Sequence, residues 1–351
     1  MNSEAVLALV LNIQIMKIAI LSSVAWRTPP RKYGPWEQIA SNIAEGMIEL
    51  GIDVTLFATG DSITKGKLAS VCEQPYSENS KVDPKVAECL HISYLMEQAD
   101  KFDLIHNNFD FLPLSYSRLI KTPMVTTIHG FSSPKILPVY KKYNSIGYYV
   151  SISNSDRSPE LDYTATVYNG INTNEFIFRR ESEDYLLFFG RIHPDKGVYE
   201  SIQIAEKSKR KLIISGLIQD QEYFNLKVKP YIDDNGIVYV GNSGPDERNE
   251  LLGGAFALLH PVSFEEPFGL SVVEAMFCGT PVIAFNRGSM PELIYEGKTG
   301  FLVNNIEEAL EAVNNIKIID RKYCREWATS KFSRQKMTEG YLKVYKKVLN
   351  V

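Results

Sequence analysis

The sequence contains few of the residues from which disulfide frameworks and metal sites are built. Its four cysteines form no C-x-x-C pair, and such scattered spacing argues against a disulfide framework and against a zinc site. The five histidines include no H-E-x-x-H motif and no pair at ligand spacing. We therefore expect no metal and no cofactor, and a reducing, cytoplasmic location.

The chain also lacks a marked excess of charge of one sign and a long hydrophobic run. It has 38 Lys and Arg against 42 Asp and Glu, a net charge of −4, so no general basic field is present to bind nucleic acid or an anionic membrane. Residues 5–15 are largely apolar, but Glu4 stands where a signal peptide needs positive charge. The run is too short to span a bilayer. We expect residues 1–15 to be a peripheral extension, with an interfacial anchor as the alternative. The protein as a whole is expected to make at most peripheral membrane contact.

Short β-rich runs alternate with helical patterns along the rest of the chain. At 351 residues the sequence has room for about two domains. The first series of predicted strands covers 17–21, 54–58, 104–106, 124–128 and 148–152, and the second covers 185–189, 211–215, 237–240, 257–260 and 282–285. Strands that alternate with helices predict parallel β-α-β units, and hence two Rossmann-like doubly wound α/β domains that face a central cleft.

The domain limits follow from the same pattern. We predict domains at residues 16–170 and 171–332, with the start of the second domain in the strand-poor stretch 169–183. The amphipathic segment 333–351 is expected to pack back on the first domain. The composition of residues 60–85 predicts an irregular segment without a regular helix or strand.

Two cations follow the strand predicted at 185–189, in the sequence G-R-I-H-P-D-K-G at 190–197. Arg191 can bridge a diphosphate bidentately and Lys196 adds a point charge beside a helix N-terminus. The motif indicates a seat for a diphosphate. A solvated turn with an ordinary basic pair is the alternative.

A second polar motif, E-E-P-F-G-L-S-V-V-E-A at 265–275, follows the strand predicted at 257–260. A helix is expected to begin at about Gly269, with free N–H groups that favour phosphate or sugar oxygens. Glu266 precedes that end and can accept hydrogen bonds from sugar hydroxyls. Glu274 lies in an otherwise apolar helix, where a carboxylate is costly unless it meets a polar ligand. An exposed helix carboxylate is the alternative.

Two further residues are predicted at the carboxyl ends of strands in the first domain. Gly34 lies in the turn that leads from the first strand to a helix over 36–50, where glycine allows close approach of a phosphate. His129 follows the strand at 124–128, so it is expected to face the cleft and to meet a sugar hydroxyl or a developing charge. A structural histidine at a strand end is the alternative.

Together these motifs, with G-S-M-P-E-L-I and G-K-T-G-F-L-V at 288–303, resemble the retaining, nucleotide-sugar-dependent glycosyltransferases of the GT-B fold, group 1 or family 4. The resemblance covers nearly the whole chain from Met16. It implies that Arg191 and Lys196 neutralise the leaving diphosphate, that Glu266 and His129 meet the donor sugar, and that Glu274 holds the ribose hydroxyls.

The resemblance also assigns backbone roles. It implies that the backbone of Phe268, Gly269 and Leu270 holds sugar and phosphate, and that Gly34 lies against the distal phosphate. The chain departs from the family where paired glycines are common, because Pro35 follows Gly34 and removes one N–H donor. A second histidine often found in the family is replaced by Asn108, so a role of His106 or Asp110 in acceptor binding is only a hypothesis.

The expected function is transfer of a hexosyl group from a nucleotide sugar to a hydroxyl of a sugar, glycan or small molecule. UDP-glucose is the favoured donor and GDP-mannose the second. A nucleotide-sugar epimerase or hydrolase and a non-catalytic nucleotide-sugar-binding protein are the alternatives. A dinucleotide oxidoreductase is excluded because no G-x-G-x-x-G follows the first strand. The acceptor remains open, since the stretch 131–149 mixes lysines and tyrosines that suit either a sugar or a weak membrane contact.

Overall fold

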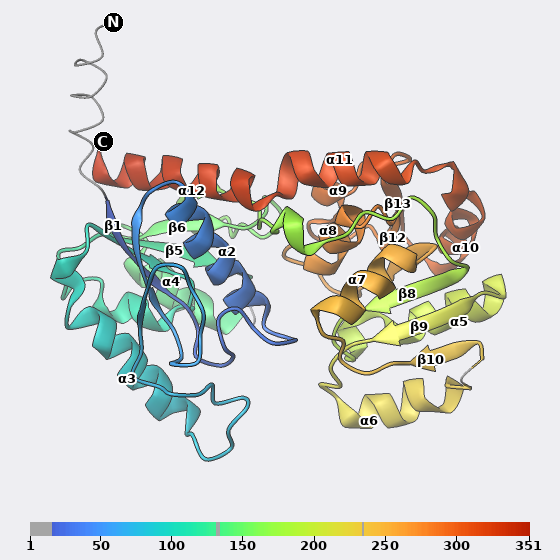
Figure 1. Ribbon diagram of the computed structural model, residues 1–351, viewed down its shortest axis with the longest axis horizontal. Helices are drawn as coiled ribbons and strands as arrows, with labels where there is room; N and C mark the ends of the chain where they lie inside the picture. The colour runs from blue at the N-terminus through green and yellow to red at the C-terminus, as the bar shows by residue number, and fades with distance from the viewer. Residues whose placement is uncertain (1–15, 131–133, 234) are drawn as a thin grey trace, which may run out of the picture.

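The computed structural model describes residues 16–130, 134–233 and 235–351 (Figure 1). The extension expected at 1–15 lies outside these residues. Two parallel sheets, each flanked by helices, occupy the two halves of the molecule (Figure 1). The predicted α/β class, with two Rossmann-like doubly wound domains, is confirmed.

The first sheet has seven strands in the order β3-β2-β1-β4-β5-β6-β7. Their bounds are β1 Lys17–Leu21, β2 Asp53–Phe57, β3 Lys67–Ala69, β4 Leu104–Asn107, β5 Met124–Ile128, β6 Tyr148–Ser151 and β7 Tyr163–Thr166. The prediction missed the two edge strands, β3 and β7. Both are short and incompletely buried, so they carry little of the apolar pattern that reveals a strand.

The second sheet has six strands in the order β10-β9-β8-β11-β12-β13. Their bounds are β8 Tyr185–Phe189, β9 Lys211–Ser215, β10 Ile237–Tyr239, β11 Ala257–His260, β12 Val282–Phe285 and β13 Gly300–Val303. The prediction missed β13. In both sheets the strand order reverses at the first strand of the series, and ligands of open α/β sheets bind at the carboxyl ends of strands beside such a point.

The helices connect the parallel strands. In the first half these are α2 Pro35–Glu49, α3 Pro84–Met96 and α4 Leu137–Tyr143. In the second half they are α5 Val198–Ser208, α6 Gln221–Tyr223, α7 Pro245–Gly254, α8 Leu270–Phe277, α9 Met290–Leu293, α10 Ile306–Asn315 and α11 Arg321–Phe332. The helices expected at 36–50, at 198–208 and from about Gly269 are present to within a residue or two.

The last helix, α12 (Arg334–Leu349), continues from α11 and runs from the second half of the molecule onto the first (Figure 1). Its apolar face joins the core of the first half. Tyr345 Oη lies 2.5 Å from Nδ1 of His106, and His106 Nε2 lies 2.8 Å from Oγ1 of Thr127. Thr127 Oγ1 in turn lies 2.8 Å from Oη of Tyr341. These buried hydrogen bonds tie α12 to the centre of the first sheet.

The buried His106 is expected to make the protein less stable in acid. Burial lowers the pKa of His106 to about 3, from an ordinary value of 6.5. Between these values the unfolded chain binds a proton that the folded chain does not, so the free energy of unfolding falls as the pH falls. A His106→Gln variant should lose this contribution, up to about 1.4 kcal/mol per pH unit between pH 6 and 4. Urea unfolding at several pH values would measure how the free energy of unfolding changes with pH in the unaltered protein and in the variant. Equal changes in the two proteins would contradict the expectation.

Candidate active site

A cleft of about 1800 Å³ lies between the two sheets and is lined by residues of both. From the first half it receives the loop between β1 and α2 and the ends of β4 and β5, and from the second half the loops after β8 and β11. All of the residues predicted as site residues from the sequence line it: His129, Arg191, Lys196, Glu266, Gly34, Phe268, Gly269, Leu270 and Glu274.

Glu266 and Lys196 form the closest charged contact in the second-domain wall of this cleft. Lys196 Nζ lies 2.5 Å from Oε2 of Glu266, and His260 Nε2 lies 3.5 Å from the same oxygen. Burial raises the pKa of Glu266, but the nearby His260 and the charge of Lys196 outweigh it and lower that pKa to about 2. Glu266 is therefore an ionised hydrogen-bond acceptor, and His260 is a neighbour that the sequence did not single out.

The backbone places Lys196 beside the end of β11. Gly197 has a φ of 76°, and a Cβ at this position would lie 2.0 Å from the carbonyl oxygen of Pro261. Only glycine fits such a close approach in the left-handed region. The second glycine of the G-R-I-H-P-D-K-G motif thus brings the loop after β8 against the loop after β11, and Lys196 reaches Glu266 for this reason.

Arg191 lies at the opening of the same loop. Its Nη1 donates to the side-chain oxygen of Gln219, and its Nη2 lies 3.8 Å from Oδ2 of Asp195. The guanidinium keeps about a quarter of its side-chain surface exposed to the cleft. The guanidinium is therefore held in place and is accessible from the cleft.

Helix α8 points its N-terminus at the cleft. Gly269 is its N-cap, with a φ of 90°, and a Cβ there would lie 2.7 Å from Cε of Met290. Phe268 is buried, and its carbonyl oxygen accepts a 2.6 Å hydrogen bond from Oγ of Ser289. The chain from Phe268 to Leu270 is therefore fixed, with the positive end of a helix beside Glu266.

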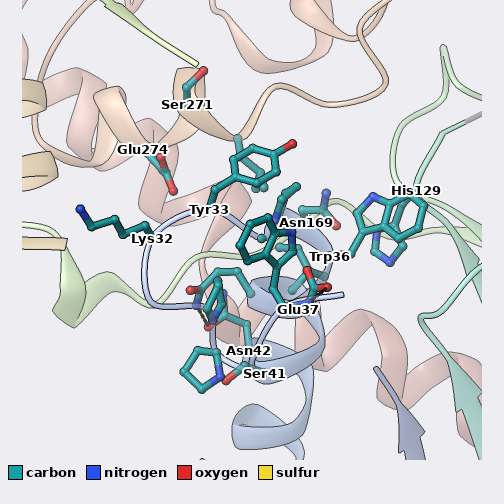
Figure 2. Close-up of a pocket in the computed structure, with 18 of the residues that line it drawn as sticks. Lys32, Tyr33, Trp36, Glu37, Ser41, Asn42, His129, Asn169, Ser271 and Glu274 are labelled. Carbon is teal, nitrogen blue, oxygen red and sulfur yellow. Dashed lines mark hydrogen bonds between the residues drawn. The ribbon is translucent and has the colours of Figure 1, made fainter. Parts of the chain in front are cut away.

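Glu274, one turn inside α8, is buried rather than exposed, so the alternative of an exposed helix carboxylate is wrong. Its Oε1 lies 3.3 Å from Nη1 of Arg248 on α7. Burial raises the pKa of Glu274, and the charge of Arg248 opposes that rise. Figure 2 shows the Glu274 carboxylate on the side of the pocket opposite α2. The sequence did not reveal Arg248, which lies in a charged stretch that resembles an ordinary solvated helix.

His129 lines the cleft at the end of β5. Its Nε2–H donates to Oδ1 of Asn108 at 3.1 Å, and its ring stacks on Trp36 at a centroid distance of 5.6 Å (Figure 2). Burial lowers the pKa of His129 to about 3, so it is a neutral imidazole whose Nδ1 can accept a hydrogen bond. His106, by contrast, uses both ring nitrogens inside the first domain, and the hypothesis that it binds an acceptor is wrong.

Gly34 is the N-cap of α2, and Pro35 occupies the first position of that helix. Glu37, in the first turn, is almost fully buried, and its Oε1 accepts a 3.2 Å hydrogen bond from the backbone N–H of Trp26. Burial raises the pKa of Glu37. Neither Glu37 nor Trp36 was singled out from the sequence, because both lie in the first turn of a helix, where side chains are ordinarily solvated.

Among the described residues, no three histidine, cysteine or acidic side chains come together in a group that could hold a metal ion. In the same part of the chain, no helix is both long and apolar enough to cross a membrane.

Two Rossmann-like domains with a cleft between them have the arrangement of the GT-B fold. Residues 171–332 match the family described as Glycosyl transferases group 1. An uncharacterized glycosyltransferase of Methanocaldococcus jannaschii is 26% identical over 336 residues, which cover 82% of this chain and 85% of the relative. A 41.2 kDa protein of the cps region of Klebsiella pneumoniae is 34% identical over 175 residues, only 46% of each chain.

The likeness extends to a solved structure. The Anabaena protein HepE, in complex with UDP and glucose, superimposes with a TM-score of 0.71 at 19% identity, over 95% of this chain and 100% of that one. The likeness to this structure shows the GT-B fold over the chain, and residues 171–332 are similar to group 1 glycosyltransferases.

Proposed function

We propose that this chain transfers a hexosyl group from a nucleotide sugar to a hydroxyl of a sugar, glycan or small molecule, with retention of anomeric configuration and without a metal or cofactor. The observation that carries the proposal is the contact between Lys196 and Glu266 in the cleft. This contact sets a cation for a diphosphate next to an ionised carboxylate for sugar hydroxyls. UDP-glucose is the proposed donor, with GDP-mannose second, and the complex of HepE with UDP and glucose supports the first.

In the proposed reaction the bond from the anomeric carbon to the diphosphate breaks while a bond to the acceptor oxygen forms on the same face. The acceptor proton passes to the leaving phosphate oxygen. Arg191 and Lys196 stabilise the charge that develops on that diphosphate. Glu266, ionised at neutral pH, accepts hydrogen bonds from donor hydroxyls. Glu274 binds the ribose, and the neutral His129 accepts from the sugar near the reacting carbon.

The donor can be tested by thermal stabilisation with UDP, GDP, ADP and their glucose, mannose and N-acetylglucosamine derivatives. A ligand that binds only the folded state stabilises it, by about 2.7 kcal/mol at 100 times its dissociation constant. We expect a selective rise in melting temperature with the UDP series. A Glu274→Ala variant should lose most of this rise, whereas Glu311→Ala, an exposed carboxylate on α10, should keep it.

No rise with any nucleotide would contradict the proposed function. Consumption of a nucleotide sugar at the same rate with and without an acceptor would instead favour an epimerase or hydrolase. Binding without any turnover would favour a nucleotide-sugar-binding protein.

A further inference from the structure

The motif G-S-M-P-E-L-I at 288–294 holds no group that acts in the proposed reaction. It forms the turn after β12 and the short helix α9. Among the residues that the structure describes, the lining of the cleft includes no member of this motif. Its glutamate, Glu292, faces the first domain instead, and the contacts that it makes there join the two domains.

Glu292 accepts four hydrogen bonds from three first-domain residues. Its Oε2 accepts from the backbone N–H of Asn154 at 2.9 Å, from the side-chain amide of Asn154 at 3.0 Å and from Oη of Tyr168 at 2.8 Å. Its Oε1 accepts from the backbone N–H of Ser155 at 2.8 Å. Hydrogen bonds to a carboxylate are stronger than those between neutral groups. Because Asn154 and Ser155 follow β6, one second-domain side chain holds the end of that strand.

The same motif holds the loop after β11. The backbone N–H of Ser289 donates to the carbonyl oxygen of Glu266 at 2.9 Å, and the Ser289 hydroxyl donates to the carbonyl oxygen of Phe268 at 2.6 Å. Gly288 has a φ of 55°, and a Cβ there would lie 2.3 Å from the same carbonyl oxygen of Glu266. One short stretch of chain therefore contacts the loop that carries Glu266 and, through Glu292, the first domain.

These contacts lie beside the place where the two residues proposed to meet the donor sugar approach each other. Gly130, directly after His129, has a φ of 116°, and a Cβ there would lie 2.6 Å from Cγ of Pro267. Pro267 directly follows Glu266, and its carbonyl oxygen accepts a 2.7 Å hydrogen bond from Oγ of Ser153. His129 of the first domain and Glu266 of the second are thus each one residue from a close contact between the domains.

Tyr168 joins Glu292 to the same loop through its ring. The rings of Tyr168 and Phe268 lie 6.3 Å apart between centroids, and they pack on Phe332 at 5.6 and 6.0 Å, respectively. Burial and the hydrogen bond to Glu292 raise the pKa of Tyr168 to about 12, so its hydroxyl remains a donor. The chain passes between the domains beside these rings, where the backbone N–H of Ile171 donates to the carbonyl oxygen of Phe332 at 2.8 Å.

We infer that Glu292 is a positioning residue for the proposed transfer. It fixes the end of β6 to the loop after β11, and it thereby sets how His129 and Glu266 meet the donor sugar from opposite domains. This inference rests on the proposed function. The groups proposed to hold the nucleotide, among them Arg191 and Glu274, belong to the second domain alone. Loss of the Glu292 contacts should therefore weaken binding of the sugar part of the donor and leave binding of the nucleotide part unchanged.

The test compares Glu292→Gln with the unaltered protein by isothermal titration calorimetry. Glutamine keeps the length of the side chain but has one acceptor oxygen, so the N–H of Asn154 or of Ser155 would face an NH2 group. The ligands are UDP, GDP, UDP-glucose, UDP-N-acetylglucosamine and GDP-mannose. We expect the Kd of the nucleotide sugar that binds to rise about tenfold or more, the effect of losing hydrogen bonds to a charged group. The Kd of its nucleoside diphosphate should change by less than about twofold.

A second variant guards against a simple loss of folding. Tyr168→Phe keeps the ring against Phe268 and removes one of the four hydrogen bonds. It should raise the Kd of the nucleotide sugar less than Glu292→Gln does, again without an effect on the nucleoside diphosphate. Equal changes in the Kd of the nucleotide sugar and of its nucleoside diphosphate in Glu292→Gln, or no change in either, would overturn the inference.

Glu308→Gln is the matched control. Oε2 of Glu308 accepts from the backbone N–H and the side-chain amide of Asn304 at 2.8 and 2.9 Å, and Oε1 accepts from the side-chain amide of Asn305 at 2.9 Å. These bonds are of the same kind as those of Glu292 but lie within the second domain, so both Kd values should stay unchanged. An equal loss of nucleotide-sugar affinity in Glu308→Gln would overturn the inference. Failure of the unaltered protein to bind any of the ligands would overturn the proposed function as well.

Discussion

Replacing Lys196 with alanine is expected to lower kcat about 10²–10³-fold, the usual effect of removing one group that stabilises a developing negative charge. The proposed reaction releases a diphosphate, and the Lys196 ammonium is one of two cations set against it. The substitution also takes the nearest cation from Glu266, 2.5 Å away. Without the charge of Lys196, the effect of burial, which raises the pKa of Glu266, is opposed less strongly. The carboxylate should then hold a proton more readily and bind donor hydroxyls less well. Steady-state kinetics with the identified donor would measure the loss.

The control for this prediction is Lys207→Ala. Lys207 lies on α5, directly after the same loop, but its side chain is half exposed and pairs with Glu307 away from the cleft. The kcat of the Lys207→Ala enzyme should stay within about a factor of two of the unaltered enzyme, since surface substitutions have small effects. A Lys196→Ala enzyme with kcat close to that of the unaltered enzyme would contradict the role assigned to Lys196.

Replacing Arg321 with methionine is expected to lower the free energy of unfolding by about 3 kcal/mol or more, because several buried oxygens would lose a charged donor. The Arg321 guanidinium donates to the carbonyl oxygens of Arg179, Ala255 and Gly253, at 2.5–2.9 Å, and to Oγ1 of Thr280 at 2.9 Å. It thereby joins the chain that enters the second domain to α7 and to the start of β12. Urea unfolding would measure the loss.

The neighbouring Lys322 offers a matched control. Its side chain is 73% exposed, so Lys322→Met should change the free energy of unfolding by no more than about 0.5 kcal/mol. Equal stability of the Arg321→Met and Lys322→Met proteins would show that the four hydrogen bonds contribute little beyond what water provides in the unfolded chain.

Much of the second-domain wall could be predicted because its residues follow strands within a few positions. Arg191 and Lys196 lie two and seven residues after the end of β8, and Glu266 lies six residues after the end of β11. Parallel strands bring their carboxyl ends to one edge of a sheet, so residues in these loops meet in space. Gly197 and Gly269 mark the two places where the backbone must turn closely. Short-range patterns are enough for such a site.

The first-domain wall could be predicted only in part. His129 was found because it follows a buried strand, but the contacts that define its state come from elsewhere in the chain, from Trp36 on α2 and from Asn108 after β4. Glu37 was missed because a glutamate in the first turn of a helix is ordinarily solvated. It becomes buried here only when the loop carrying Trp26 folds over it.

The sequence by itself determined the alternation of strands and helices, the doubly wound α/β class and the cationic and acidic loops of the second domain, because each follows from residues close together in the chain. Only the tertiary structure decided which distant groups became partners. Arg248 meets Glu274 across two helices, and Tyr345 reaches His106 from the far end of the chain. Such pairings depend on how helices pack over a sheet, and the local periodicity of the sequence does not determine that packing.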